Sequence, residues 1–370
     1  MRKIILALTV LLMFCGVSYA DFIYTTSTGS LGTITINSSS DIEESPNQYA
    51  GKLSSPFLTT YWNGSTTRLA LIDRNATASG DRAYIFTPDS LANYSASWDI
   101  AGVYGTEEAG YSENGYSLFL TSGAWIYEIR TADFRVLNSY DCTRILSNDS
   151  YSTEIVSINV DSSLINVIVA AGDARRYAQF DGQLDDTRDY FKSRDVSSGA
   201  SSVLSTSDNY NAIGHSSGID VINRRNADFY AIASTDYPVK AMCLDNSGSL
   251  FYATQYQSGD EYVNTIMHLA DGTSFSPVTI ESSFSNIKLV RDDSKRETFA
   301  AMTNEGISII TYKDKLTSTH EFTASMLGGT PVGIVSATVS GYNGNSSSSG
   351  CDASGLGLMM LAAVLVMRRK

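Results

Sequence analysis

The sequence is poor in the residues that define several common protein classes. Only 18% of its side chains are charged and six of its 370 residues are proline, while 43% are apolar, which excludes a disordered chain. Four cysteines are too few for a disulfide-dense scaffold. Three histidines, His215, His268 and His320, have no metal-ligand spacing, and neither a P-loop nor a dinucleotide-binding fingerprint occurs. We therefore expect a globular body, and the spacing of its residues assigns no catalytic residue, no metal ligand and no cofactor.

Basic residues are also scarce. The net charge is −13, and because the two ends of the chain hold five basic side chains and one acidic one, residues 21–350 have a net charge of −17. A strongly acidic body repels phosphate backbones, which excludes nucleic acid as an expected partner.

Residues 1–20 have the layout of a secretory signal peptide. A basic pair precedes an apolar run at residues 4–14, and Ser18 and Ala20 are the small residues that signal peptidase requires. We expect cleavage after Ala20, so that the mature, exported chain begins at Asp21.

The other end reads as a linker and a membrane tail. Residues 341–350 are rich in Ser, Gly and Asn, which predicts a flexible tether, and residues 351–370 contain an apolar run. A helix of this run is about 22 Å long, shorter than the ~30 Å hydrocarbon core, and the basic terminus predicts that its end is cytoplasmic. The apolar and basic residues assigned to this transmembrane tail are Leu356, Leu358, Leu361, Val364, Leu365, Arg368, Arg369 and Lys370.

The tail resembles a known class of bacterial sorting signal. Its serine spacer, Gly350-Cys351, the Gly/Ala/Leu helix and the terminal Arg-Arg-Lys are similar to the Synergist-CTERM type. The resemblance covers only about the last 25 residues. It implies a cell-surface protein that a rhomboid-like sorting protease cleaves near Gly350 and Cys351. The alternative is a plain C-terminal membrane anchor.

The body between residues 21 and 340 is a repeat. An apolar strand, a short turn and a second alternating strand recur seven times, which indicates β-hairpins. Spacings between successive turn glycines run from 41 to 49 residues, a length typical of propeller blades. The seven glycines assigned to the turns are Gly32, Gly80, Gly123, Gly172, Gly218, Gly259 and Gly306.

The ends of the repeat complement each other. A strand at residues 331–340 has no hairpin after it, and the first hairpin, near residue 22, has no strand before it. Joining them completes one blade and removes open sheet edges. We therefore predict an all-β protein, a seven-bladed β-propeller over residues 21–340 closed by the N-terminal hairpin and the C-terminal strand. The alternatives are paired β-sandwiches or a β-helix.

Two further residue sets have a structural and a functional interpretation. Gly-Asp pairs at Asp81, Asp173 and Asp260 would offer carboxylates to calcium, but a carboxylate that caps its own turn is favoured. Cys142 and Cys243 are expected to be buried thiols.

Three functions fit these features. The first is a non-enzymatic cell-surface module that binds a protein, peptide or glycan through loops at the channel mouth. The second is a periplasmic scaffold anchored by an uncleaved tail. The third is a hydrolase or lyase that acts on extracellular polymers with carboxylates near that mouth. A funnel with paired carboxylates and a perturbed pKa favours the enzyme, and a plugged channel with an aromatic rim favours binding.

Overall fold

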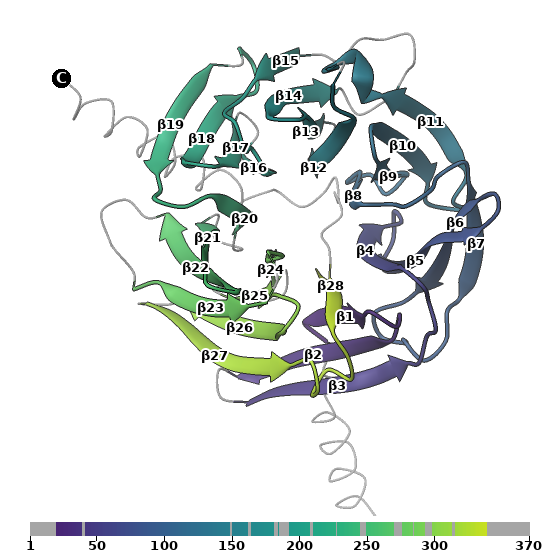
Figure 1. Ribbon diagram of the computed structural model, residues 1–370. Coiled ribbons are helices and arrows are strands. Elements are labelled where there is room, and N and C mark those ends of the chain that lie inside the picture. Colours follow the sequence, from purple (N-terminus) through teal and green to yellow (C-terminus); the bar gives the residue numbers. More distant parts are fainter. Residues whose placement is uncertain are drawn as a thin grey trace, which may run out of the picture.

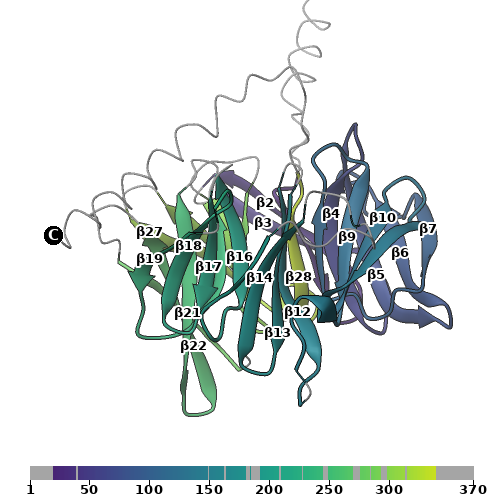
Figure 2. The same cartoon turned by 90° about the horizontal axis from the view of Figure 1, so that it is seen from above.

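The computed structural model forms a closed ring of seven four-stranded antiparallel sheets around a central axis (Figure 1). It describes residues 20–338 except 39–40, 149, 162–163, 181–183, 185–191, 208–209, 227, 245–248, 270–275, 284, 293–297 and 313–314. This architecture confirms the predicted seven-bladed β-propeller. In side view the blades stand next to one another around the axis, and the β21–β22 hairpin (Leu250–Ser258 and Glu261–Leu269) reaches beyond its neighbours (Figure 2).

Each blade runs from an innermost strand at the axis to an outermost strand at the rim. Blades 1 and 2 consist of β28 (Pro331–Ser336), β1 (Phe22–Thr26), β2 (Leu31–Ser38) and β3 (Asp41–Tyr49), then β4 (Pro56–Trp62), β5 (Thr67–Thr77), β6 (Gly80–Phe86) and β7 (Ala96–Ala101). Blades 3 and 4 consist of β8 (Glu108–Tyr111), β9 (Ser117–Ser122), β10 (Trp125–Arg130) and β11 (Val136–Asp141), then β12 (Thr153–Asp161), β13 (Leu164–Ala171), β14 (Ala174–Phe180) and β15 (Lys192–Asp195).

The remaining blades follow the same order. Blade 5 consists of β16 (Ser202–Ser207), β17 (Tyr210–His215), β18 (Gly218–Asn223) and β19 (Phe229–Ser234). Blades 6 and 7 consist of β20 (Val239–Leu244), β21, β22 and β23 (Val278–Ser282), then β24 (Lys288–Arg291), β25 (Thr298–Met302), β26 (Gly306–Tyr312) and β27 (Leu316–Thr323). One 3-10 turn, η1 (Cys142–Arg144), follows blade 3.

Blade 1 joins the two ends of the body. Strand β28 pairs antiparallel with β1, with Phe22 opposite Ser336 and Ile23 opposite Val335. The predicted closure is therefore confirmed. Figure 1 shows yellow β28 beside purple β1. The backbone of Asp21 extends this junction, because its N–H donates to Ile34 and its carbonyl accepts from Ala337.

The apolar core lies between the blades, in seven separate clusters, one at each blade interface. Strand β1 shows the cause. Successive side chains of a strand point to opposite faces, so Phe22 and Tyr24 pack against blade 7 while Ile23 packs against blade 2. A central strand covered on both faces needs an uninterrupted apolar run, which explains why the hairpins are so apolar.

The seven predicted hairpins are the second and third strands of the seven blades. Gly123, Gly172 and Gly259 lie in the turns, and Gly80, Gly218 and Gly306 begin third strands. The prediction that Gly32 lies in a turn is wrong. It lies inside β2, opposite Tyr24, and the turn of the first hairpin lies between β1 and β2, where Gly29 has a φ of 82°. Its lack of a side chain has another reason, because a Cβ at Gly32 would collide with the ring of Tyr24.

The predicted ends lie outside the described residues, apart from Ala20. This applies to the signal segment up to residue 19, to Gly350 and Cys351 and to the tail at 351–370. In the part of the chain that the structure describes, no helix is long and apolar enough to span a membrane.

We predict that Gly32→Ala lowers the free energy of unfolding by about 1–3 kcal/mol, because the added methyl group overpacks the Tyr24 ring. Urea denaturation of both proteins measures the change. A double-mutant cycle with Tyr24→Ala is the control: without the ring, Gly32→Ala should cost much less. An equal cost in both backgrounds would contradict the collision.

Candidate functional site

A cavity of about 270 Å³ occupies the centre of the ring. Its lining comes from five innermost strands, β4, β8, β12, β24 and β28, so it is the central channel of the propeller. Blade 3 approaches blade 4 closely here because Gly110 has no side chain: a Cβ would lie 2.5 Å from Cγ2 of Val160. The channel is thus a narrow space rather than a wide pore.

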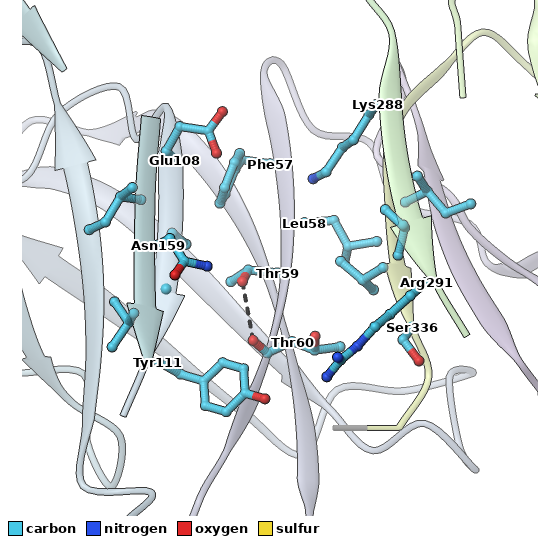
Figure 3. Close-up of a pocket in the computed structure, with 17 residues that line it drawn as sticks. Phe57, Leu58, Thr59, Thr60, Glu108, Tyr111, Asn159, Lys288, Arg291 and Ser336 are labelled. Carbon is cyan, nitrogen blue, oxygen red and sulfur yellow. Dashed lines mark hydrogen bonds between the residues drawn. The ribbon is translucent and has the colours of Figure 1, made fainter. Parts of the chain in front are cut away.

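The two ends of the channel carry different residues (Figure 3). Glu108 and Lys288, which begin β8 and β24, lie near one end, while Tyr111 and Arg291, which end these strands, lie near the other. The inner strands therefore run in the same direction. We name the ring face where they begin the Glu108 face and the opposite one the Arg291 face.

Glu108 and Lys288 face each other across the channel near the Glu108 face (Figure 3). Each acts on the other electrostatically, because the Lys288 charge favours the ionised form of Glu108. Among the described residues no ion pair within 4 Å joins them. The lumen between the two side chains is therefore open to a polar ligand that carries groups for both charges.

The ring enclosing Glu108 changes its acidity. Solvent reaches the carboxylate through the lumen, but protein surrounds it on the other sides. This desolvation raises the pKa of Glu108 above its ordinary value, with a smaller contribution from the neighbouring Glu107 and an opposing one from Lys288. Glu107 itself accepts a hydrogen bond of 3.1 Å from the backbone N–H of Gly123 and so ties β8 to the β9–β10 turn.

The channel is positive within an acidic protein. Its lining includes Lys288 and Arg291 as cations and Glu108 as the single carboxylate. Hydroxyl and amide groups of Thr60, Tyr111 and Asn159 stand beside them (Figure 3). This combination of charges and hydrogen-bond groups suits recognition of a small polar ligand.

Asn159 is held in place from blade 5. Its Oδ1 accepts hydrogen bonds from Ser205, at 3.1 Å from the backbone N–H. Ser205 also contacts the buried Asn211, whose amide nitrogen donates to Asn166 at 2.9 Å and to the hydroxyl of Tyr177 at 2.7 Å. A satisfied buried network of this kind fixes side-chain positions, so the channel wall at Asn159 is rigid.

Among the three Gly-Asp pairs, Asp81 has a structural role. Its carboxylate is fully buried and accepts hydrogen bonds from the backbone N–H groups of Asn75, Gly105 and Thr106 and from the Thr106 hydroxyl. Asp173 and Asp260 are exposed. Within the described residues no group of three or more His, Cys, Asp or Glu side chains could hold a metal ion.

A serine motif in blade 5 also has a structural setting. Gly214-His215-Ser216-Ser217-Gly218 has the G-x-S-x-G spacing of hydrolases, but it forms the β17–β18 hairpin and not a strand-to-helix elbow. The buried His215 lies 3.4 Å from Asp220, and its Nδ1 accepts from the backbone N–H of Ser217 at 3.3 Å. The side chain of His215 therefore stabilises its own turn.

Those predicted site residues that the structure describes lie away from the channel lining. Ala20 and Asp21 belong to the blade 1 junction, and the glycines of the turns ring the Glu108 face outside the channel. Sequence reasoning did not single out Glu108 or Lys288. Neither belongs to a motif; the available signal was that each begins an innermost strand. The two expected thiols, Cys142 and Cys243, are buried in different parts of the ring and form no disulfide with each other.

Comparison with known proteins supports the propeller fold. No protein-family model and no curated protein matches the chain. Among solved structures, the WD40 domain of coronin from Toxoplasma gondii has 11% identity and a TM-score of 0.52, over 73% of this chain and 75% of that one. A chain of the mitotic checkpoint complex has 14% identity, a TM-score of 0.49 and coverages of 71% and 79%. Dihydro-heme d1 dehydrogenase NirN has 10% identity and a TM-score of 0.48, over 82% of this chain and 63% of that one. At these values the coronin domain shows a shared WD40-like propeller fold and nothing about activity.

We predict that Glu108→Gln raises the free energy of unfolding at neutral pH. A carboxyl whose pKa is raised on folding destabilises the folded state once pH exceeds that pKa, and a neutral amide removes this penalty. Below the ordinary pKa of glutamate both states are protonated, so the gain should vanish there. Urea denaturation between pH 4 and 8 measures it.

The exposed Glu261 provides the control, because Glu261→Gln removes the same charge from the acidic protein without a channel environment. Equal gains for both variants at every pH would contradict a raised pKa at Glu108.

Proposed function

We propose that this protein is an exported, non-enzymatic binding module of the cell surface, whose channel holds a short peptide with free termini. One observation carries the proposal: Glu108 and Lys288 face each other across the lumen without an ion pair. A free peptide brings an ammonium group for Glu108 and a carboxylate for Lys288, so both charges gain a partner.

The size of the channel supports a small ligand. A volume of about 270 Å³ is at the lower end of pockets that hold small molecules, so a short peptide or a chain end enters and a folded domain does not. Arg291 adds a second positive charge to the lining, towards the Arg291 face. Binding thus uses the charges that distinguish the channel from the acidic exterior.

The single carboxylate of the lining supports binding rather than glycoside hydrolysis. Retaining and inverting glycosidases work with two carboxyl groups about 5–9 Å apart. Glu108 has no second carboxyl group beside it among the lining residues, whereas a cation stands opposite.

We expect short peptides with free termini to bind the purified full chain, and N-acetylated, C-amidated forms of the same peptides to bind at least about tenfold more weakly. Glu108→Gln and Lys288→Met should each weaken binding about tenfold, the effect of one charge-assisted hydrogen bond. Calorimetric titration with a set of tripeptides measures both.

Two distant substitutions are the matched controls. Glu261→Gln and Lys315→Met remove exposed charges away from the channel and should leave the affinity unchanged. Equal binding of free and capped peptides, or full binding by both channel variants, would refute the proposed ligand.

Cell-surface location is proposed from the signal segment and the sorting-type tail. We expect the native protein, recovered from the surface or medium fraction, to have an intact mass that begins at Asp21 and ends near Gly350 or Cys351. Mass spectrometry of separated inner-membrane, outer-membrane and medium fractions measures this. A chain from Asp21 to Lys370 found in the inner membrane would instead establish the anchored periplasmic scaffold.

A further inference from the structure

A second cavity, of about 310 Å³, lies between blades 2 and 3, away from the channel. Asn63 follows the end of β4 and Thr131 follows the end of β10, and both strands run from the Glu108 face to the Arg291 face. The cavity therefore opens on the Arg291 face. Beside the cavity, the turn at Gly64 packs directly on Gly115, where any Cβ would collide with it.

Arg68 is the only charged residue in the lining of this cavity. Four other arginines, Arg82, Arg130, Arg176 and Arg224, each form an ion pair with an aspartate. The described residues provide no such partner for Arg68, which is only half-buried. In a protein with a net charge of −13, a cation that faces a cavity without a carboxylate is available to an anion from outside.

Asn63 provides a further donor beside Arg68. Oδ1 of Asn63 already accepts hydrogen bonds from Ser65 and Thr66 of its own turn, so the amide NH₂ is the group left for a ligand. The guanidinium of Arg68 has five N–H donors in a planar fork that matches a carboxylate. The hydroxyls of Ser95 and Thr131 already donate to the backbone carbonyls of Ile85 and Gly115. The donors that remain for a ligand are therefore Arg68 and Asn63, and they suit a ligand that carries a carboxylate.

Trp98 adds a flat apolar surface to the same cavity. It lies on β7, the outermost strand of blade 2, and 40% of its surface is exposed. An indole face is electron-rich and packs against the polarised C–H groups on one face of a pyranose ring. An acidic peptide would satisfy Arg68 equally well, but it would make no comparable use of Trp98.

We propose that the Arg68–Trp98 cavity binds an acidic sugar, a uronic acid unit of a polysaccharide. The carboxylate pairs with Arg68, the sugar hydroxyls accept from Asn63, and the pyranose ring stacks on Trp98. This site is separate from the channel, because it lies between blades 2 and 3 and the channel lies at the centre of the ring.

The test is calorimetric titration of the full chain with a trimer of galacturonic acid and with the matching neutral trimer of galactose. We expect the acidic trimer to bind at least tenfold more tightly, and binding to weaken as salt rises. Arg68→Gln should weaken it about 10- to 100-fold, Arg68→Lys less, and Trp98→Ala about tenfold.

Matched controls come from the same ring. Trp125, also 40% exposed, begins β10 at the Glu108 face, and Arg135 is an exposed arginine outside the cavity; Trp125→Ala and Arg135→Gln should change the affinity less than twofold. Absence of binding, equal affinity for the neutral trimer, or full affinity of Arg68→Gln would overturn the proposal. Tighter binding of N-acetylated, C-amidated hexaglutamate than of the acidic trimer would overturn the sugar assignment. Capping removes the free termini that the channel is proposed to hold, so this outcome is separate from the channel ligand.

Discussion

The pairing of β28 with β1 is the constraint on which the rest of the molecule depends. A strand from the C-terminal end of the body completes the blade that the N-terminal hairpin begins, with Ile23 opposite Val335. Backbone hydrogen bonds thereby hold the first and seventh blades next to each other. Glu108 and Lys288, on blades 3 and 7, can face the same lumen only in a closed ring.

The stability of the ring is distributed over seven interfaces. Each apolar cluster belongs to two neighbouring blades, so a blade buries both faces only when both neighbours are present. The interface of blades 4 and 5 adds a buried polar link, in which Arg224 donates to Asn211 at 2.8 Å and pairs with Asp161. Because the core lies between blades, the surface turns are free to carry recognition groups.

Charge distribution separates the exterior from the two candidate sites. The protein as a whole is acidic, yet the channel holds Lys288 and Arg291, and the cavity between blades 2 and 3 holds Arg68. Arg291 is exposed, and Lys288 and Arg68 are half-buried. These positive charges gather at two cavities of an otherwise acidic protein. Their position therefore carries more functional information than the excess of acid on the surface.

The sequence by itself determined the repeat, the seven hairpins and the closure, because alternating apolar residues and turn residues act over a few neighbouring positions. It misplaced one turn, at Gly32, because a glycine required by the packing of Tyr24 looks the same as a turn glycine. Only the tertiary structure decided which polar residues meet. Glu108 and Lys288 lie on different blades and line the channel, and Arg68 and Thr131 lie on different blades and line the second cavity. The curvature of the ring brings each pair together, and no local sequence pattern encodes that curvature.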